Sequence, residues 1–236
     1  MRTVCGIARR IQVVLGWGVD PPQAPAPAAA LTRRSLLSGK PGEQRRDGVR
    51  LDQVDGTTCG SAVLVALAAW ADPAELDRLA GPDGTAAPGA AGGARSIDGF
   101  GARYDARQRE VHRQTNRIWP RALGTTPWSM VRWLRRHAPG AGSYRVRLVD
   151  DMSVADVARA LDAVTGAVAA GRPVPLLVGT AVPRHYTMAL AGDDAAWRVY
   201  EPTSGAIRVL DLHLVRAHAL RPVLGFDRLH AVLLPT

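Results

Sequence analysis

Four residues in this sequence have the types and positions needed for nucleophilic catalysis, and the first two lie close together. Cys59 comes just before a strongly apolar run, Val63 to Trp70, so we predict that it begins a helix. A helix N-terminus carries partial positive charge and free N–H groups, which favour a thiolate over a thiol. Gln53 lies six residues upstream, and its side-chain amide can donate to a developing oxyanion. An isolated buried structural cysteine is the alternative interpretation.

The other two residues, a histidine and an acid, stand at the ends of short β-rich runs. His185 directly precedes the run Tyr186–Leu190, and Glu201 ends the run that begins at Ala196. If a hairpin joins the two runs, the antiparallel register places Glu201 opposite, or nearly opposite, His185. A carboxylate in that position fixes the tautomer of the imidazole. Taken singly, His185 is equally well read as a half-buried edge histidine and Glu201 as a solvent-facing acid.

The elements that must position these residues change in type along the chain. Apolar spacing and capping residues predict helices over residues 60–71, 73–80, 126–137 and 154–170. Short β-rich runs predict strands over residues 144–149, 174–179, 186–191, 196–200, 207–210 and 229–234, with consecutive hairpins among them. Residues 81–95 indicate a flexible loop, and residues 96–121 have no clear pattern. Helices followed by an antiparallel sheet predict an α+β fold, with a helical N-terminal half packed on a C-terminal antiparallel β-sheet.

Domain organisation follows from shifts in composition. Residues 1–20 suit a short amphipathic helix, residues 21–30 are a Pro- and Ala-rich linker, and residues 31–48 are polar and basic. We therefore predict a flexible basic N-terminal segment over residues 1–48 and one folded domain over residues 49–236. The length of 236 residues suffices for such a domain with a complete core.

Charge, hydropathy and cysteine content bear on whether the protein binds nucleic acid, spans a membrane or holds a metal. The net charge is +9, and all the basic residues except Lys40 are arginine. The arginines are scattered without interleaved aromatic residues, so we expect no specific nucleic-acid binding. No apolar run is long enough to span a bilayer, and we expect a cytoplasmic protein, with export by a specialised route left open. With only Cys5 and Cys59, we expect neither a metal nor a cofactor, although a Cys5–Cys59 disulfide would silence the thiol.

These motifs together resemble those of the papain-like cysteine peptidases, in the bacterial branch similar to the double-glycine leader peptidases of bacteriocin export systems. The resemblance covers residues 49–210 and is carried by residues 53–61, 125–131, 172–178, 185–192 and 199–205. Cys59-Gly60-Ser61 fits the start of the papain signature, whereas Ala62 and Val63 depart from its end.

The resemblance implies a papain-like fold in which Cys59 is the nucleophile, His185 the base and Gln53 the oxyanion donor. Glu201 stands where the family usually has Asp or Asn, and we expect Gly60 and Trp128 to contact substrate. The implied function is hydrolysis of peptide or isopeptide bonds in a peptide or protein substrate, through an acyl-enzyme. A thiol acyltransferase with the same triad and a catalytically inactive domain that binds a peptide or protein partner are the alternatives. The sequence does not indicate the oligomeric state.

Overall fold

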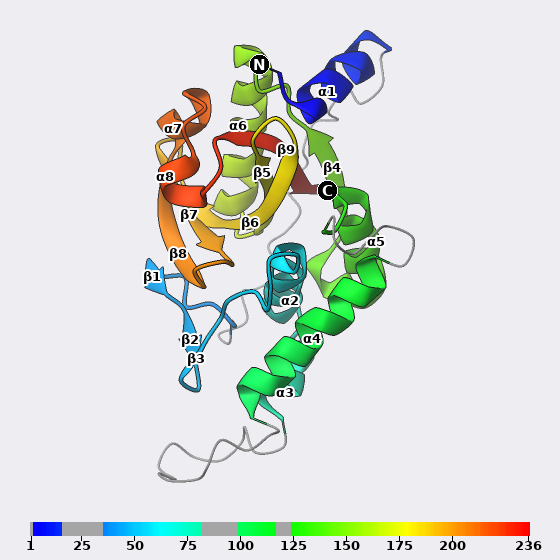
Figure 1. Cartoon of the computed structure of the whole chain (residues 1–236), viewed down its shortest axis with the longest axis vertical. Helices are drawn as coiled ribbons and strands as arrows, with labels where there is room; N and C mark the ends of the chain where they lie inside the picture. Colours follow the sequence, from blue (N-terminus) through cyan, green and yellow to red (C-terminus); the bar gives the residue numbers. More distant parts are fainter. Residues whose placement is uncertain (1, 16–34, 82–98, 117–123) are drawn as a thin grey trace.

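An antiparallel sheet of seven strands forms the centre of the molecule (Figure 1). The computed structural model describes residues 2–15, 35–81, 99–116 and 124–236. Within these residues the strand order is β1-β8-β7-β6-β5-β9-β4, and every neighbouring pair is antiparallel. The strands of this sheet are β1 (Gly42–Glu43), β4 (Tyr144–Leu148), β5 (Val174–Gly179), β6 (Pro183–Gly192), β7 (Ala196–Glu201), β8 (Ala206–Asp211) and β9 (Arg228–Pro235). A separate two-stranded ribbon is formed by β2 (Arg45–Arg46) and β3 (Val49–Arg50).

The helices include the four that the sequence predicts. They are α1 (Val4–Val14), α2 (Cys59–Ala71), α3 (Pro73–Ala80), α4 (Phe100–Thr115), α5 (Pro127–His137), α6 (Val154–Ala169), α7 (Leu212–Arg216) and α8 (Arg221–Leu224). The side chains of Asp72, Thr126 and Ser153 cap α3, α5 and α6 by accepting a backbone N–H of the first turn. The α+β class is confirmed, because helices dominate the N-terminal half and consecutive hairpins join β6, β7 and β8.

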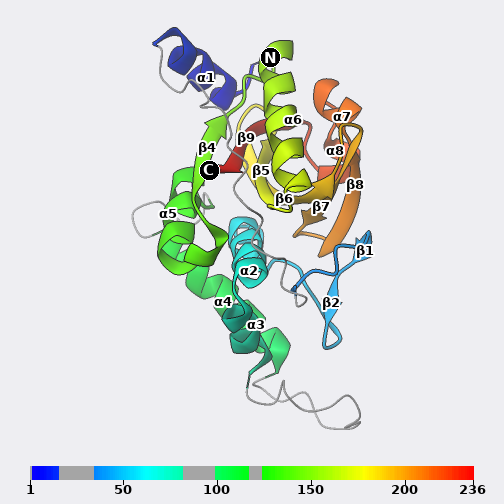
Figure 2. The ribbon, with the colours of Figure 1, turned by 180° about the vertical axis from the view of Figure 1, so that it is seen from behind.

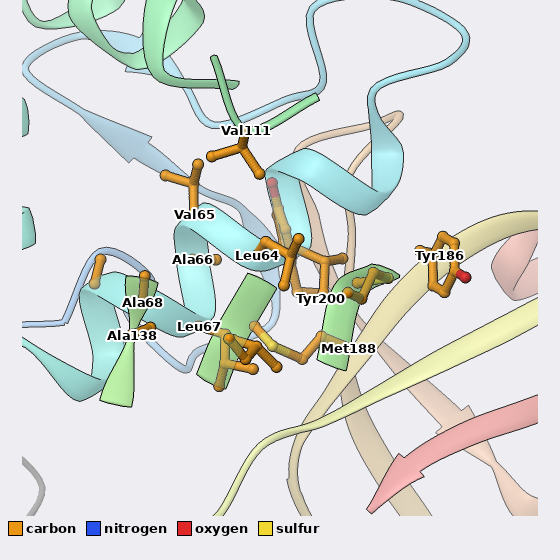
Figure 3. Close-up of a cluster of buried hydrophobic side chains, with 14 of the residues drawn as sticks. Leu64, Val65, Ala66, Leu67, Ala68, Val111, Ala138, Tyr186, Met188 and Tyr200 are labelled. Atoms are coloured by element: carbon orange, nitrogen blue, oxygen red, sulfur yellow. The ribbon is translucent and has the colours of Figure 1, made fainter. Parts of the chain in front are cut away.

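Helices cover both faces of the sheet, as the two opposite views show (Figure 1, Figure 2). Strand residues alternate between the two cores: Leu177 and Met188 belong to the core that contains α2, whereas Leu176 and Ala189 belong to the core that contains α6. Helix α2 is apolar nearly all round, and each residue from Cys59 to Ala69 is buried. It lies between β6 and α4, so its position and that of its N-terminus are fixed from several sides (Figure 3).

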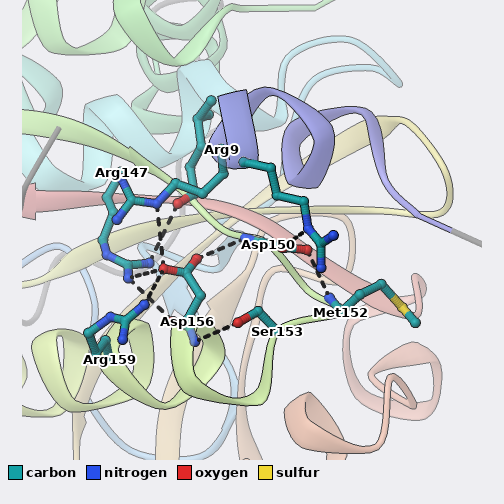
Figure 4. A network of polar contacts seen from close by, with 9 residues as sticks. Arg9, Arg147, Asp150, Met152, Ser153, Asp156 and Arg159 are labelled. Atoms are coloured by element: carbon teal, nitrogen blue, oxygen red, sulfur yellow. Dashed lines mark hydrogen bonds and ion pairs between the residues drawn. The ribbon is translucent and has the colours of Figure 1, made fainter. Parts of the chain in front are cut away.

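The sequence predicts a flexible segment over residues 1–48. The described parts of this segment instead pack on the rest of the domain. The Thr3 hydroxyl donates to the Asp151 carboxylate at 2.9 Å, and the Val4 N–H donates to the Ala181 carbonyl at 3.0 Å. Arg9, 5% exposed, reaches the buried carboxylate of Asp156 (Figure 4). Further along, β1 adds an edge strand to β8. Residues 2–15 and 35–48 are therefore parts of the folded domain.

A cluster of charged side chains links α1 to the start of α6 through ion pairs and hydrogen bonds (Figure 4). Asp156 accepts from the guanidinium of Arg147 at 2.9 Å and from the backbone N–H of Asp150 at 2.9 Å. Arg147 is 2% exposed. Buried charges are tolerated only when paired and hydrogen-bonded, so this cluster fixes the N-terminal helix in one position.

The structure describes most of the segment 96–121, which has no clear sequence pattern, but little of the predicted loop before it. Helix α4 occupies most of the segment 96–121, and its buried face mixes apolar Val111 with polar Gln108 and His112. Gln108 donates to the Asp52 carbonyl at 3.0 Å. A face this polar gives a weak apolar periodicity, which explains why the helix is not evident from sequence. The predicted loop over residues 81–95 lies, beyond Gly81, outside the described residues.

Over the described residues, no single helix has the length and apolarity that a membrane span requires. Helices α2 and α3 reach that length and apolarity only when taken together, and the chain bends by 116° between them.

Candidate active site

Cys59 is the first residue of α2, and a tight loop sets its position. The Asp55 carboxylate accepts from the Thr57 N–H at 2.8 Å and from the Thr57 hydroxyl at 2.7 Å. The Thr58 hydroxyl accepts from the Asp55 N–H at 3.0 Å, which closes the turn. The first N–H groups of a helix have no carbonyl within the helix to bind, so those at the start of α2, next to Cys59, remain available as donors. Cys59 itself is 5% exposed.

His185 and Glu201 form a buried hydrogen-bonded pair on β6 and β7. The His185 Nε2 to Glu201 Oε1 distance is 2.8 Å, and both residues are 5% exposed. The observed register pairs Met188 with Tyr200, because β6 extends to Gly192 and a bulge interrupts its pairing with β7. Glu201 is therefore offset along the strand from His185 rather than directly opposite. The side chains still meet, since residues two apart on a strand share a face.

Glu201 is held in place by the turn that follows it. Its Oε1 accepts from the Thr203 N–H at 2.8 Å, and its Oε2 accepts from the Ser204 N–H at 2.9 Å and the Ser204 hydroxyl at 2.7 Å. Burial alone raises the pKa of this carboxyl, but the hydrogen bonds from His185, Ser204 and Thr203 outweigh it and lower the pKa to about 2. Glu201 is therefore a fixed negative charge at neutral pH.

The pKa of His185 is raised to about 9. Burial acts in the opposite direction and lowers it, but interactions with the side chains of Cys59 and Glu201 have the larger combined effect. Since Nε2 faces Glu201, Nδ1 is the ring nitrogen left for the thiol. The structure thus brings together the three residues Cys59, His185 and Glu201, which are far apart in the sequence.

Gln53 lies beside this triad, next to the turn that holds Glu201. Its backbone N–H donates to the Pro202 carbonyl at 2.9 Å, and its Oε1 accepts from the Thr203 hydroxyl at 3.3 Å. One N–H of its amide donates to the Asp55 carbonyl at 2.6 Å. The second amide N–H has no partner among the described residues. Gln53 and His185 line the same cavity, so this remaining N–H is the one that can serve an oxyanion.

Residues of the triad line two cavities, which differ in character. One, of about 340 Å³, is lined by Cys59 and mainly apolar residues of α1, α5, β5 and β6. The other, of about 550 Å³, is lined by His185, Glu201 and Gln53 together with arginines and residues of α8. Arg184 lines both. Cys59 therefore lines one cavity and His185 lines the other.

The two predicted substrate contacts have different outcomes. Trp128, 56% exposed, lines the apolar cavity together with Cys59. Gly60 lines neither cavity. A Cβ at Gly60 would lie 3.2 Å from Cδ2 of Tyr186 and 3.3 Å from Cβ of Thr125. Gly60 therefore lets α2 approach β6 closely, which is a packing role.

Several residues of the site have only weak signals in the sequence. Thr203 and Ser204 lie in a Pro-Thr-Ser-Gly turn after Glu201, a composition that predicts a turn but not its hydrogen bonds to the carboxylate. Arg184 has only its place next to His185 in the sequence to indicate it. Nothing in the sequence indicates that α1 lines the apolar cavity.

Cys5, on α1, lines the apolar cavity together with Cys59, and both cysteines are free thiols. Burial, and to a smaller extent the charge of Asp151, raise the pKa of Cys5 to about 11. Cys5 is therefore a protonated, weakly nucleophilic thiol at neutral pH.

Over the described residues, no group of three or more His, Cys, Asp or Glu side chains could hold a metal ion. Comparisons with protein-family models, curated proteins and solved structures give no significant match.

Proposed function

We propose that this protein is a cysteine-dependent hydrolase that cleaves peptide or isopeptide bonds, with a papain-like triad of Cys59, His185 and Glu201. The observation that supports the proposal is the buried imidazole that interacts with a thiol on one side and with a hydrogen-bonded carboxylate on the other. A nucleophile, a base and a group that orients the base are the parts that covalent catalysis requires.

In the proposed first step, the Cys59 thiolate attacks the substrate carbonyl carbon. A carbon–sulfur bond forms, and the carbonyl π electrons move to the oxygen. The free N–H groups at the start of α2 and the remaining amide N–H of Gln53 donate to that oxyanion. When the carbon–nitrogen bond breaks, the His185 imidazolium donates its proton to the leaving amine, which departs neutral.

In the second step, His185 accepts a proton from water as the water oxygen attacks the thioester. The carbon–sulfur bond then breaks, which releases a carboxylic acid and restores the thiolate and the imidazolium. If an amine takes the place of water, the same step forms an amide, which is the acyltransferase alternative. Glu201 accepts the hydrogen bond from Nε2 throughout and keeps Nδ1 directed at the reaction.

The test is cleavage of a diverse peptide mixture, with products identified by mass spectrometry. We expect cleavage by the wild type and by Arg113→Gln, a surface change on α4, and no cleavage by Cys59→Ala or His185→Ala. Addition of a primary amine separates the two chemistries: an acyltransferase yields amide products, whereas a hydrolase yields acids. Absence of cleavage and of amide products with folded wild-type protein would contradict the proposal and favour a peptide-binding domain.

A further inference from the structure

The cavity beside His185 has an excess of positive charge that the proposed triad does not use. The described residues that line it include three arginines, Arg184, Arg208 and Arg221, and one carboxylate, that of Glu201. The formal charge of the lining is thus +2, or +3 when His185 is protonated. Val223, Leu224 and Phe226 form the apolar wall of the cavity.

Most of this positive charge has no partner among the residues that the structure describes. Glu201 is already engaged by His185 and by the turn after it, and the Arg208 guanidinium lies 3.9 Å from it. Arg184 and Arg221 are exposed, and neither makes a hydrogen bond or ion pair with the described parts of the chain. Guanidinium groups form short, bidentate hydrogen bonds with carboxylates. The cavity therefore offers binding capacity for an anionic group.

The proposed chemistry determines which part of a substrate enters this cavity. The acyl part becomes bonded to the sulfur of Cys59, a residue that lines the apolar cavity. The leaving amine takes its proton from His185, which lines the arginine-lined cavity. The residues that follow the scissile bond therefore lie among the arginines.

From this arrangement we infer that the arginine-lined cavity is the leaving-group subsite and that it selects substrates with a carboxylate after the scissile bond. The carboxylate belongs to an Asp or Glu side chain within the first residues of the leaving segment. This inference rests on the proposed function for its assignment to the leaving side. The binding preference itself rests only on Arg184, Arg208 and Arg221.

The first test measures binding without turnover. Cys59→Ala protein is titrated into the peptides Ala-Glu-Glu-Ala and Ala-Gln-Gln-Ala, each with a C-terminal rhodamine, and fluorescence anisotropy is recorded. We expect about tenfold tighter binding of the Glu peptide at low salt, with the difference reduced at about 0.5 M salt because screening weakens exposed charge pairs. Equal affinity for the two peptides would overturn the inference.

Variants that each remove one arginine charge test whether the preference for the Glu peptide arises in this cavity. Arg184→Gln and Arg221→Gln, each combined with Cys59→Ala, are expected to lose most of the preference for the Glu peptide. Arg113→Gln, which removes the same charge from α4, is expected to retain it. Both cavity arginines are exposed, so we expect these variants to fold. A preference that survives Arg184→Gln and Arg221→Gln, or falls equally in Arg113→Gln, would overturn the assignment to this cavity.

Cleavage assays separate this inference from the proposed function. Wild-type protein is given peptides with Glu, Gln or Lys directly after one shared cleavage site. The inference predicts the order Glu, Gln, Lys in kcat/KM, and a smaller Glu-to-Gln ratio in Arg184→Gln and Arg221→Gln. Cleavage without this order refutes the leaving-side assignment and leaves the hydrolase intact. Tight binding of the Glu peptide without any cleavage refutes the hydrolase and leaves an anion-binding site.

Discussion

Replacement of Glu201 by glutamine tests how the buried carboxylate controls His185. The substitution keeps the shape of the side chain and removes its charge. In the wild type, hydrogen bonds lower the pKa of Glu201 from 4.5 to about 2, a difference that corresponds to about 3 kcal/mol of favourable interaction with the ionised form. Glutamine keeps one acceptor oxygen, but its NH2 group must face either His185 or the donors of Ser204. We therefore expect Glu201→Gln to lose up to about 3 kcal/mol of stability near neutral pH.

The pH dependence of this loss has a definite direction. The raised pKa of His185 stabilises the folded state below pH 6.5, and this contribution is lost as pH rises through about 9. The lowered pKa of Glu201 stabilises it above pH 4.5, and this contribution is lost as pH falls through about 2. The difference in unfolding free energy between wild type and Glu201→Gln is therefore largest between pH 4.5 and 6.5. Urea titrations at a series of pH values measure it.

The same substitution shifts the activity profile. An imidazolium with a pKa of about 9 protonates the leaving amine up to that pH, so the alkaline limb of kcat/KM is expected near pH 9 in the wild type. Cys59 and Glu201 both contribute to the raised pKa of His185. We expect Glu201→Gln to move the alkaline limb down by about one pH unit. Glu201→Asp, which keeps the charge but shortens the side chain, separates lost charge from lost contact. An alkaline limb unchanged in Glu201→Gln would refute this account.

Three further predictions concern other parts of the structure. Because the pKa of Cys5 is raised to about 11, iodoacetamide at pH 7 should modify Cys59 well before Cys5; peptide mapping that finds Cys5 modified first would contradict this. Asp156→Ala removes the shared partner of Arg9 and Arg147 and should lower the unfolding free energy by about 3–5 kcal/mol, measured by urea titration; a loss under about 1 kcal/mol would argue against a tightly paired cluster. Gly60→Val adds a Cβ that would lie 3.2 Å from Tyr186, together with two methyl groups, and should lower the unfolding free energy by about 1–3 kcal/mol and slow the alkylation of Cys59. Unchanged stability in a urea titration would show that α2 does not need this close approach.

The sequence predicts the helices and strands that carry the triad, because local signals define them. Cys59 begins a run that is apolar nearly all round, and Thr126 with Pro127 marks the start of α5. The contact between His185 and Glu201 follows from counting residues along a hairpin. The bulge in β6 changes the register, but the contact persists because the offset keeps both residues on one face of the sheet.

Other parts of the site depend on contacts between distant segments and are not evident in the sequence. Helix α1 is fixed by buried charges such as Asp156, and nothing near residues 1–20 indicates that partner. The arginines of the arginine-lined cavity come from β6, β8 and α8. Because the chain contains many arginines, none of the three is distinctive in the sequence. The position of Gln53 depends on hydrogen bonds of its backbone and side chain to Pro202 and Thr203, which lie far downstream in the sequence.

The proposed function depends on activation of the Cys59 thiol by His185. The most direct test is the rate of iodoacetamide alkylation at Cys59, followed by peptide mapping from pH 5 to pH 10, in wild type and His185→Ala. We expect alkylation of Cys59 at pH 6 to be much faster in the wild type than in His185→Ala, because the imidazole beside the thiol makes it a better nucleophile. Identical pH profiles of the alkylation rate in the two proteins would contradict this activation.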